Sequence, residues 1–262
     1  MDKQNLSIGF LDSGLGGISV LKEAIKILPN EDYIYYGDSK HAPYGTKSID
    51  EIKKLTFNVV HQLMKQGIKA LVVACNTATS AAINNLRATY PDFPIIGIEP
   101  AIKPAVEHAK GKTILALATP MTVKQEKFQH LLSLYQNQAH IVPIPCKGLM
   151  EFVEKGDLNG PFLEAYFNEH VLPYMDENTS QIVLGCTHYP FLKPYLKTWL
   201  GTKQIDIIDG SKGTALELKR KLEEKDLLNP NTKQGTIRFE NSLDQQEIYD
   251  LCWKLLRLDI DE

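Results

Sequence analysis

Two cysteines occupy matching places in two similar segments of this 262-residue chain. Residues 70–77 form an apolar run that ends in a small residue, then Cys75, then polar residues, and residues 181–188 repeat this order around Cys186. A lone cysteine after a strand is usually a small buried residue, but two matching turns suggest a shared cause. A thiolate on one face of a tetrahedral carbon can remove a proton while a thiol on the other face delivers one. That exchange inverts a stereocentre.

Such thiols need a neighbour that favours the thiolate, because a free cysteine titrates near pH ~8.5. We predict a helix after each of the two cysteines, and a helix N-terminus favours negative charge. A disulfide is the first alternative, but scattered cysteines without a C-x-x-C pair are typical of a reducing, cytoplasmic setting. Zinc is the second, yet only His188 lies close to either cysteine in sequence. Cys146 and Cys252 lack a strand-end setting, and we interpret both as ordinary core or surface residues.

Polar clusters follow four of the predicted strands. In open α/β sheets, ligands bind beyond the carboxyl ends of the strands, so these clusters are candidate ligand contacts, although each alone could simply cap a helix. The glycine-rich turn 12–17 lacks the lysine of a P-loop, and Ser19 stands where the dinucleotide fingerprint requires its last glycine. Its N–H groups could instead bind a carboxylate. The four clusters are Asp12-Ser13-Gly14, Gly37-Asp38-Ser39, Cys75-Asn76-Thr77 and Cys186-Thr187-His188.

The elements that would position these residues are short buried strands alternating with amphipathic helices. Continuous apolar runs of this length, separated by helical periodicity, indicate an α/β fold with mostly parallel, helix-covered sheets. The two cysteine segments further suggest two related halves. We place the first domain at 1–97 plus 207–262 and the second at 98–206. The predicted strands are 8–11, 33–36, 71–74, 94–98, 113–117, 141–144, 181–184 and 205–208, and the clearest helices are 17–28, 49–64 and 78–86.

Composition excludes several classes of protein. Lys and Arg number 29 against 32 Asp and Glu, a formal charge of −3, which argues against nucleic acid held by general electrostatics. Hydrophobic residues at 43% and charged residues at 23% are ordinary globular values, so disorder is not indicated. No apolar stretch approaches the ~20 residues of a spanning helix, and no secretory signal is visible. We therefore expect a cytoplasmic enzyme with no nucleic-acid or membrane partner.

Taken in order, the motifs of this chain resemble those of the glutamate racemase family, within the aspartate/glutamate racemase superfamily. The resemblance extends from about residue 8 to residue 215, which is most of the chain. It rests on Asp12-Ser13-Gly14-Leu15-Gly16-Gly17, Gly37-Asp38-Ser39, Pro43-Tyr44-Gly45, Ala74-Cys75-Asn76-Thr77-Ala78-Thr79, Gly97-Ile98-Glu99-Pro100, Ala118-Thr119-Pro120, Thr122-Val123 and Leu184-Gly185-Cys186-Thr187-His188-Tyr189-Pro190.

The resemblance implies two pseudosymmetric α/β domains with the active site in the interdomain cleft. It also implies an amino-acid racemase, an isomerase that interconverts L- and D-glutamate without cofactor or metal and supplies D-glutamate for peptidoglycan, cell wall biogenesis and cell shape. In the family the first thiolate, here Cys75, takes the α-proton from D-glutamate and the second, Cys186, from L-glutamate. Asp12 would assist Cys75, His188 would assist Cys186, and Glu154 would support the histidine. A cytoplasmic homodimer is expected.

The same resemblance assigns the contacts with the substrate glutamate. Amides, hydroxyls and backbone N–H groups suit this ligand, because they can hold two carboxylates and an ammonium without adding strong bases. The positions implied are Asp12, Ser13, Pro43, Tyr44, Gly45, Cys75, Asn76, Thr77, Cys186, Thr187 and His188.

Two segments depart from the family pattern, Lys40-His41-Ala42 before the Pro-Tyr-Gly motif and residues 147–151 before Glu154. Asp12 comes early in the chain, so we expect no N-terminal extension and no activation by a peptidoglycan precursor. Two other functions stay open. One is racemisation of aspartate or another amino acid, against which the Asn76–Thr79 and Cys186–His188 motifs argue. The other is a non-catalytic binding protein with the same fold, which would not need both thiols.

Overall fold

The computed structural model describes residues 3–260 and divides the chain into two compact units. The first unit comprises Met1–Glu99 and Ser211–Arg257, and the second comprises Pro100–Gly210 with the residues after Arg257. The predicted boundary between residues 206 and 207 would cut strand β8 (Asp206–Asp209), which pairs along its whole length with β7 (Thr179–Leu184). Residues 207–209 therefore belong to the second unit, whereas the sequence pattern assigns them to the first.

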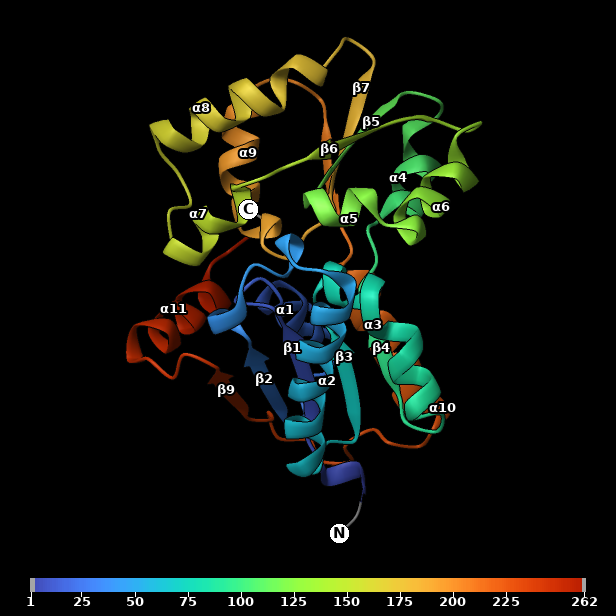
Figure 1. The fold of residues 1–262 in the computed structure, drawn as a ribbon, viewed down its shortest axis with the longest axis vertical. Coiled ribbons are helices and arrows are strands. Elements are labelled where there is room, and N and C mark those ends of the chain that lie inside the picture. Colours follow the sequence, from blue (N-terminus) through green and yellow to red (C-terminus); the bar gives the residue numbers. More distant parts are fainter. Residues whose placement is uncertain (1–2, 261–262) are drawn as a thin grey trace. The chain divides into compact units, whose positions relative to one another are not determined.

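The first unit is a parallel five-stranded sheet in the order β4-β3-β1-β2-β9 (Figure 1). The three central strands are buried along their length, because helices cover both faces of the sheet. Helix α2 packs with α3, and α1 packs with α10 and α11. The strands are β1 (Ile8–Asp12), β2 (Tyr33–Gly37), β3 (Ala70–Val73), β4 (Ile95–Gly97) and β9 (Ile237–Asn241), and the helices are α1 (Ile18–Ile27), α2 (Ile49–Lys65), α3 (Asn76–Thr89), α10 (Ser211–Glu224) and α11 (Gln246–Arg257).

The second unit is a parallel four-stranded sheet in the order β6-β5-β7-β8. Figure 1 shows α4 and α6 on one side of these strands and α8 and α9 on the other. Small and branched residues of α4 and β5 form the core beneath α6, around Phe128. The remaining elements are β5 (Thr113–Ala118), β6 (His140–Pro145), α4 (Ile102–Ala109), α5 (Pro120–Lys124), α6 (Glu126–Tyr135), α7 (Leu149–Lys155), α8 (Pro161–His170) and α9 (Lys193–Leu200).

Short 3₁₀ helices connect several of these elements. Among residues 3–260, no helix is both long and apolar enough to cross a membrane. The 3₁₀ helices are η1 (Lys3–Asn5), η2 (Ser39–His41), η3 (Tyr44–Thr46), η4 (Leu172–Tyr174) and η5 (Tyr189–Leu192).

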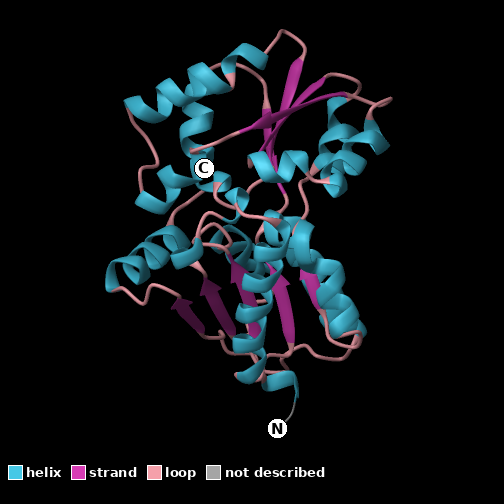
Figure 2. Ribbon diagram, viewed as in Figure 1, coloured by secondary structure: helices cyan, strands magenta, loops and turns pink. Residues whose placement is uncertain are grey.

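The two units share one topology. When the strands of each unit are numbered along the chain, both sheets contain the order second, first, third, fourth. This is β2-β1-β3-β4 in the first unit and β6-β5-β7-β8 in the second. Strands and flanking helices alternate in both units (Figure 2), so the predicted α/β class with parallel, helix-covered sheets is confirmed. Strand β9 was not predicted. It pairs with β2 and forms the edge of the sheet. Its residues alternate between apolar and charged, as in an edge strand that exposes one face to solvent.

Candidate active site

Both cysteines follow the third strand of their unit, beside the end of the first strand. Ala74 N donates to Leu11 O at 2.7 Å immediately before Cys75, and Gly185 N donates to Leu117 O at 2.7 Å immediately before Cys186. In this strand order the first and third strands are neighbours whose connections leave in opposite directions. Such a switch point opens a crevice at the carboxyl ends of the strands, where α/β proteins bind ligands.

Cys75 is the N-cap residue of α3, so the predicted helix after it is confirmed. Its backbone is extended, and its Sγ accepts from Ala78 N at 3.5 Å. The Ser13 hydroxyl lies 3.4 Å from the same sulfur. A helix N-terminus and a hydroxyl both stabilise negative charge on sulfur, and these contacts therefore suit a thiolate base.

Asp12 ends β1 and is fully buried. Its Oδ2 accepts from Gly14 N at 3.2 Å and Gly17 N at 3.1 Å, so the glycine-rich turn folds around this carboxylate. Gly17 has no room for a side chain, because a Cβ there would lie 2.8 Å from the Cβ atoms of both Asp12 and Ala74. The turn holds its own aspartate at the strand end next to Cys75.

Asn76 and Thr77 begin α3 and are both buried. The Asn76 side-chain oxygen accepts no hydrogen bond from any residue that the structure describes. A buried amide oxygen without a donor costs free energy in the empty protein, and a ligand that brings a donor recovers it. This acceptor suits an ammonium group.

The loop after β2 carries Pro43, Tyr44 and Gly45, which the sequence assigns to substrate contact. The buried Tyr44 hydroxyl donates to Asp38 Oδ2 at 2.7 Å. Burial and the charge of Asp38 raise the pKa of Tyr44 far above its usual value, so the phenol stays protonated. Since the hydroxyl proton is donated to Asp38, Tyr44 can donate to a ligand only through its main-chain N–H.

Cys186 differs from Cys75 in the element that comes after it. A turn and the short 3₁₀ helix η5 come next and lead into α9 at Lys193, so a helix follows Cys186 as predicted, but Cys186 does not cap it as Cys75 caps α3. The His188 Nδ1 atom lies 3.7 Å from the Cys186 sulfur instead. Thr187 between them is buried. An imidazole here takes the place that the helix N-terminus has at Cys75.

Glu154, from α7, completes this group, with Oε1 at 2.5 Å from His188 Nε2. Burial opposes the charge on His188. The hydrogen bonds to Cys186 and Glu154, and the negative charges of both, outweigh burial and raise the pKa of His188 well above its ordinary value. This direction favours a protonated ring, which can donate to the Cys186 sulfur through Nδ1 and to the Glu154 carboxylate through Nε2.

Cys146 directly follows β6, so the interpretation that it lacks a strand-end setting is wrong. Its N–H donates to Ala118 O at 2.8 Å. Burial raises the pKa of the Cys146 thiol to about 12, which makes it a poor base near neutral pH. Cys252 is buried on α11, and none of the four cysteines is in a disulfide.

Thr119 belongs to one of the family-like motifs, but no role for it was predicted from the sequence. It follows β5 by one residue, as Ser13 follows β1. Its hydroxyl is buried, caps α5 and donates to Thr122 Oγ1 at 2.9 Å. Ser13 contacts Cys75, and the shared topology gives Thr119 the corresponding position in the second unit. The hydroxyl residue directly after the first strand of each unit was the available signal.

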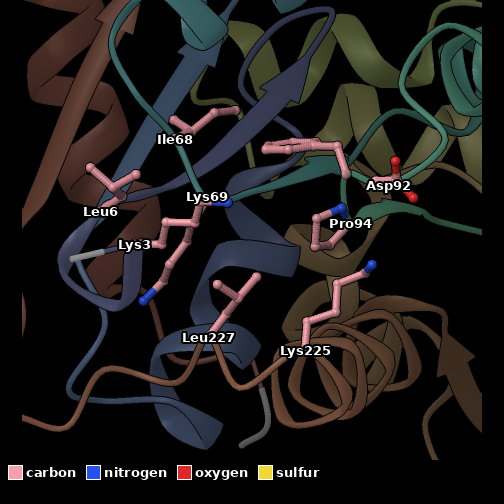
Figure 3. Close-up of a pocket in the computed structure, with 9 residues that line it drawn as sticks. Lys3, Leu6, Ile68, Lys69, Asp92, Pro94, Lys225 and Leu227 are labelled. Carbon is pink, nitrogen blue, oxygen red and sulfur yellow. The ribbon is translucent and has the colours of Figure 1, made fainter. Parts of the chain in front are cut away.

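A cavity of about 380 Å³ lies at the opposite end of the first unit's sheet (Figure 3). Leu6, Ile68 and Pro94 line it, and each comes just before a strand, β1, β3 or β4. The predicted site residues of this unit follow the carboxyl ends of the strands, and none of them lines this cavity. It is therefore separate from the candidate catalytic edge.

Comparisons with known proteins show the family of this chain. The family model Asp/Glu/hydantoin racemase matches residues 13–216. The glutamate racemase of Clostridium novyi is 54% identical over 257 residues, 98% of this chain and 99% of the relative, and that of Clostridium perfringens is 51% identical over 98% of both.

Solved structures give the same result. Glutamate racemase isoform RacE1 from Bacillus anthracis matches with a TM-score of 0.87 and 31% identity, over 98% of this chain and 96% of that one. The Francisella tularensis glutamate racemase in complex with D-glutamate matches with a TM-score of 0.83 and 28% identity, over 99% and 96%.

Proposed function

The chain belongs to the glutamate racemases of the Asp/Glu/hydantoin racemase family, and we propose that it interconverts L- and D-glutamate by proton transfer between the α-carbon and two cysteine thiols. The observation that carries this proposal is the pair of thiols at equivalent strand ends, each with its own group that stabilises a thiolate. A protein that only binds glutamate needs neither.

The first half-reaction uses the Cys75 thiolate, which takes the α-proton of D-glutamate onto its sulfur. The α3 N-terminus and Ser13 stabilise this thiolate before the transfer. Asp12, held beside it by Gly14 and Gly17, orients the thiol and the substrate ammonium. In the reverse direction the same thiol returns its proton to the carbanion.

The second half-reaction uses Cys186 in the same way on L-glutamate. The His188 imidazolium stabilises its thiolate, and Glu154 holds the ring with Nδ1 directed at the sulfur. In each direction one cysteine starts as thiolate and the other as thiol. After one turnover their protonation states are exchanged, so the charge of the site is unchanged.

The α-carbon is a weak acid, so the carbanion requires strong stabilisation by hydrogen-bond donors in a site that excludes water. We assign the ammonium of glutamate to the Asn76 oxygen, and its carboxylates to donors of Ser13, Thr77 and Thr187 and to the main-chain N–H groups of Tyr44 and Gly45, which follow Pro43. These assignments need no cofactor and no metal. We further propose a cytoplasmic homodimer that supplies D-glutamate for peptidoglycan.

The function is tested by following optical rotation of L-glutamate with the purified protein and no added cofactor. Cys75→Ala and Cys186→Ala should each lower the rate by at least about a hundredfold, since removal of a general base costs about that much or more. Cys252→Ala is the matched control and should stay active, because this thiol lies on α11. Near-native rates in either catalytic variant would overturn the two-thiol assignment. Faster turnover of aspartate would overturn the substrate, and glutamate binding without racemisation would favour a binding protein.

A further inference from the structure

We propose that His41 is a positioning residue for the substrate loop, which acts through Asp38 and Tyr44 to hold the main chain of residues 43–45. The inference rests on the proposed function, because these residues are assigned to glutamate there. His41 belongs to the segment 40–42, in which the sequence departs from the family pattern.

The contacts form a chain from the surface into the core of the first unit. His41 Nδ1 lies 2.8 Å from Asp38 Oδ1, and Tyr44 Oη lies 2.7 Å from Asp38 Oδ2. The Asp38 carboxylate is 3% exposed and the His41 side chain 42%. One buried carboxylate therefore joins a half-exposed histidine to a fully buried tyrosine.

The carboxylate needs these donors. A buried carboxylate is costly unless hydrogen bonds satisfy its oxygens, and an ionised carboxylate can only accept. The His41 ring must then carry a proton on Nδ1, whether it is neutral or charged. Without that donor, Asp38 Oδ1 would turn toward water, and Oδ2 would move with it because both oxygens belong to one planar group.

The start of the loop, residues 39 and 40, is held by separate hydrogen bonds from the end of β9 and the residue after it. Lys40 N donates to Ser242 Oγ at 2.9 Å, and Asn241 Nδ2 donates to Ser39 Oγ at 2.8 Å, so the end of β9 fixes the start of the loop. These bonds do not reach Tyr44. The Asp38 carboxylate is what connects the fixed start of the loop to the residues assigned to substrate.

The prediction is a change in KM with little change in kcat, because the loop binds glutamate and transfers no proton. His41→Leu should raise KM for both enantiomers by about two- to tenfold, the range of one hydrogen bond at a half-exposed donor, with kcat altered less than about twofold. His41→Asn keeps an N–H donor near the place of Nδ1 and should restore KM. His41→Gln carries its amide one carbon farther out and should restore it less well.

Lys40→Ala is the matched control, since Lys40 is an exposed neighbour on η2 whose contact with Ser242 uses only the main chain. A second readout is the ring of His41 in ¹⁵N NMR. We expect a proton on Nδ1, as the contact with Asp38 requires. This measurement uses the wild-type protein and therefore does not depend on how well a variant folds.

Several results would overturn the inference. A fall in kcat at unchanged KM in His41→Leu would mean a role in proton transfer, and unchanged kinetics in all three variants would mean no role. An Nε2-protonated neutral ring would break the contact on which the positioning role depends. The wild type separates this inference from the proposed function. If it does not racemise glutamate, the proposed function fails, whereas an active wild type with unaffected His41 variants contradicts the positioning role alone.

Discussion

Removing the charge of Glu154 should slow the Cys186 half-reaction and leave the Cys75 half-reaction intact. Glu154→Gln keeps the shape of the side chain and a neutral hydrogen bond to His188 Nε2. It removes the carboxylate that now lies 2.5 Å away and is only 20% exposed. The imidazolium then has a neutral partner in place of a charged one at Nε2, and the thiolate at Cys186 loses part of its stabilisation.

The size of the effect can be worked out from this contact. A hydrogen bond between charged groups contributes about 1.5–3 kcal/mol, and a neutral one about half as much. The variant should therefore lose roughly 0.8–1.5 kcal/mol in the transition state, a four- to twelvefold fall in kcat/KM. The two enantiomers have equal free energy in water, so kcat/KM must fall equally in both directions. Rates alone therefore cannot identify the affected cysteine.

Isotope effects on α-deuterated glutamate can identify it. If the Cys186 step becomes rate-limiting, α-deuterated L-glutamate should show a larger isotope effect than in the wild type, because Cys186 breaks that bond. The isotope effect on α-deuterated D-glutamate should shrink, since Cys75 breaks that bond in a faster step. Asp12→Asn, on the Cys75 side, is the matched variant and should show the opposite asymmetry. Loss of rate with symmetric isotope effects in both variants would refute the assignment of one helper to each thiol.

Three further predictions concern charge and packing. Lys69→Met should lower the free energy of unfolding by about 3–5 kcal/mol in denaturant titration, because it leaves the buried carboxylate of Glu31 without the ammonium that lies 2.5 Å away. Adding Glu31→Gln should recover much of this free energy, and no recovery would contradict the pairing. Gly17→Ala should cost about 1–3 kcal/mol by the clash with Asp12 and Ala74, while the control Gly213→Ala, with no atom within 4 Å of a new Cβ, should not destabilise the protein. The pKa of His188 is raised well above its ordinary value of about 6.5, so the ring should be an imidazolium at pH 7.5. Two protonated ring nitrogens in ¹⁵N NMR would show this. Its contribution to stability, relative to His188→Asn, should be complete below about pH 6.5 and should disappear as the pH rises through the raised pKa; a neutral ring at pH 7.5 would contradict this.

The sheets could be predicted because parallel strands covered on both faces need apolar residues at every position. That pattern predicted β1, β2, β3 and β5 within one residue of their ends, and it placed the start of β7 two residues late. Strand β9 has a different environment, with Ile237 and Phe239 facing inward and Arg238 exposed. A short alternating segment after a long polar stretch carries too little signal to be assigned from sequence alone.

The candidate site divides in the same way. The setting of Cys75 could be predicted from the local sequence, because a strand, the cysteine and an amphipathic helix follow one another there. The partner of Cys186 was not foreseeable from a helix rule, since a 3₁₀ turn follows it. Glu154 is 34 residues from His188, so only the family resemblance pointed to it before the structure brought the two together. The setting of Cys146 depends on where β6 ends, which the interrupting prolines of that strand obscure.

The central claim is that two different thiols act on opposite faces of one carbon, and solvent deuterium tests it most directly. L-Glutamate would be incubated with the protein in deuterium oxide, and the reaction would be stopped before about a tenth of it is converted. The enantiomers would then be separated, and the deuterium content of each would be measured by mass spectrometry. Two bases predict D-glutamate that carries deuterium at the α-carbon, while the recovered L-glutamate keeps its original proton. D-Glutamate that retains the substrate's own α-proton would mean that a single base serves both faces, and would contradict the account.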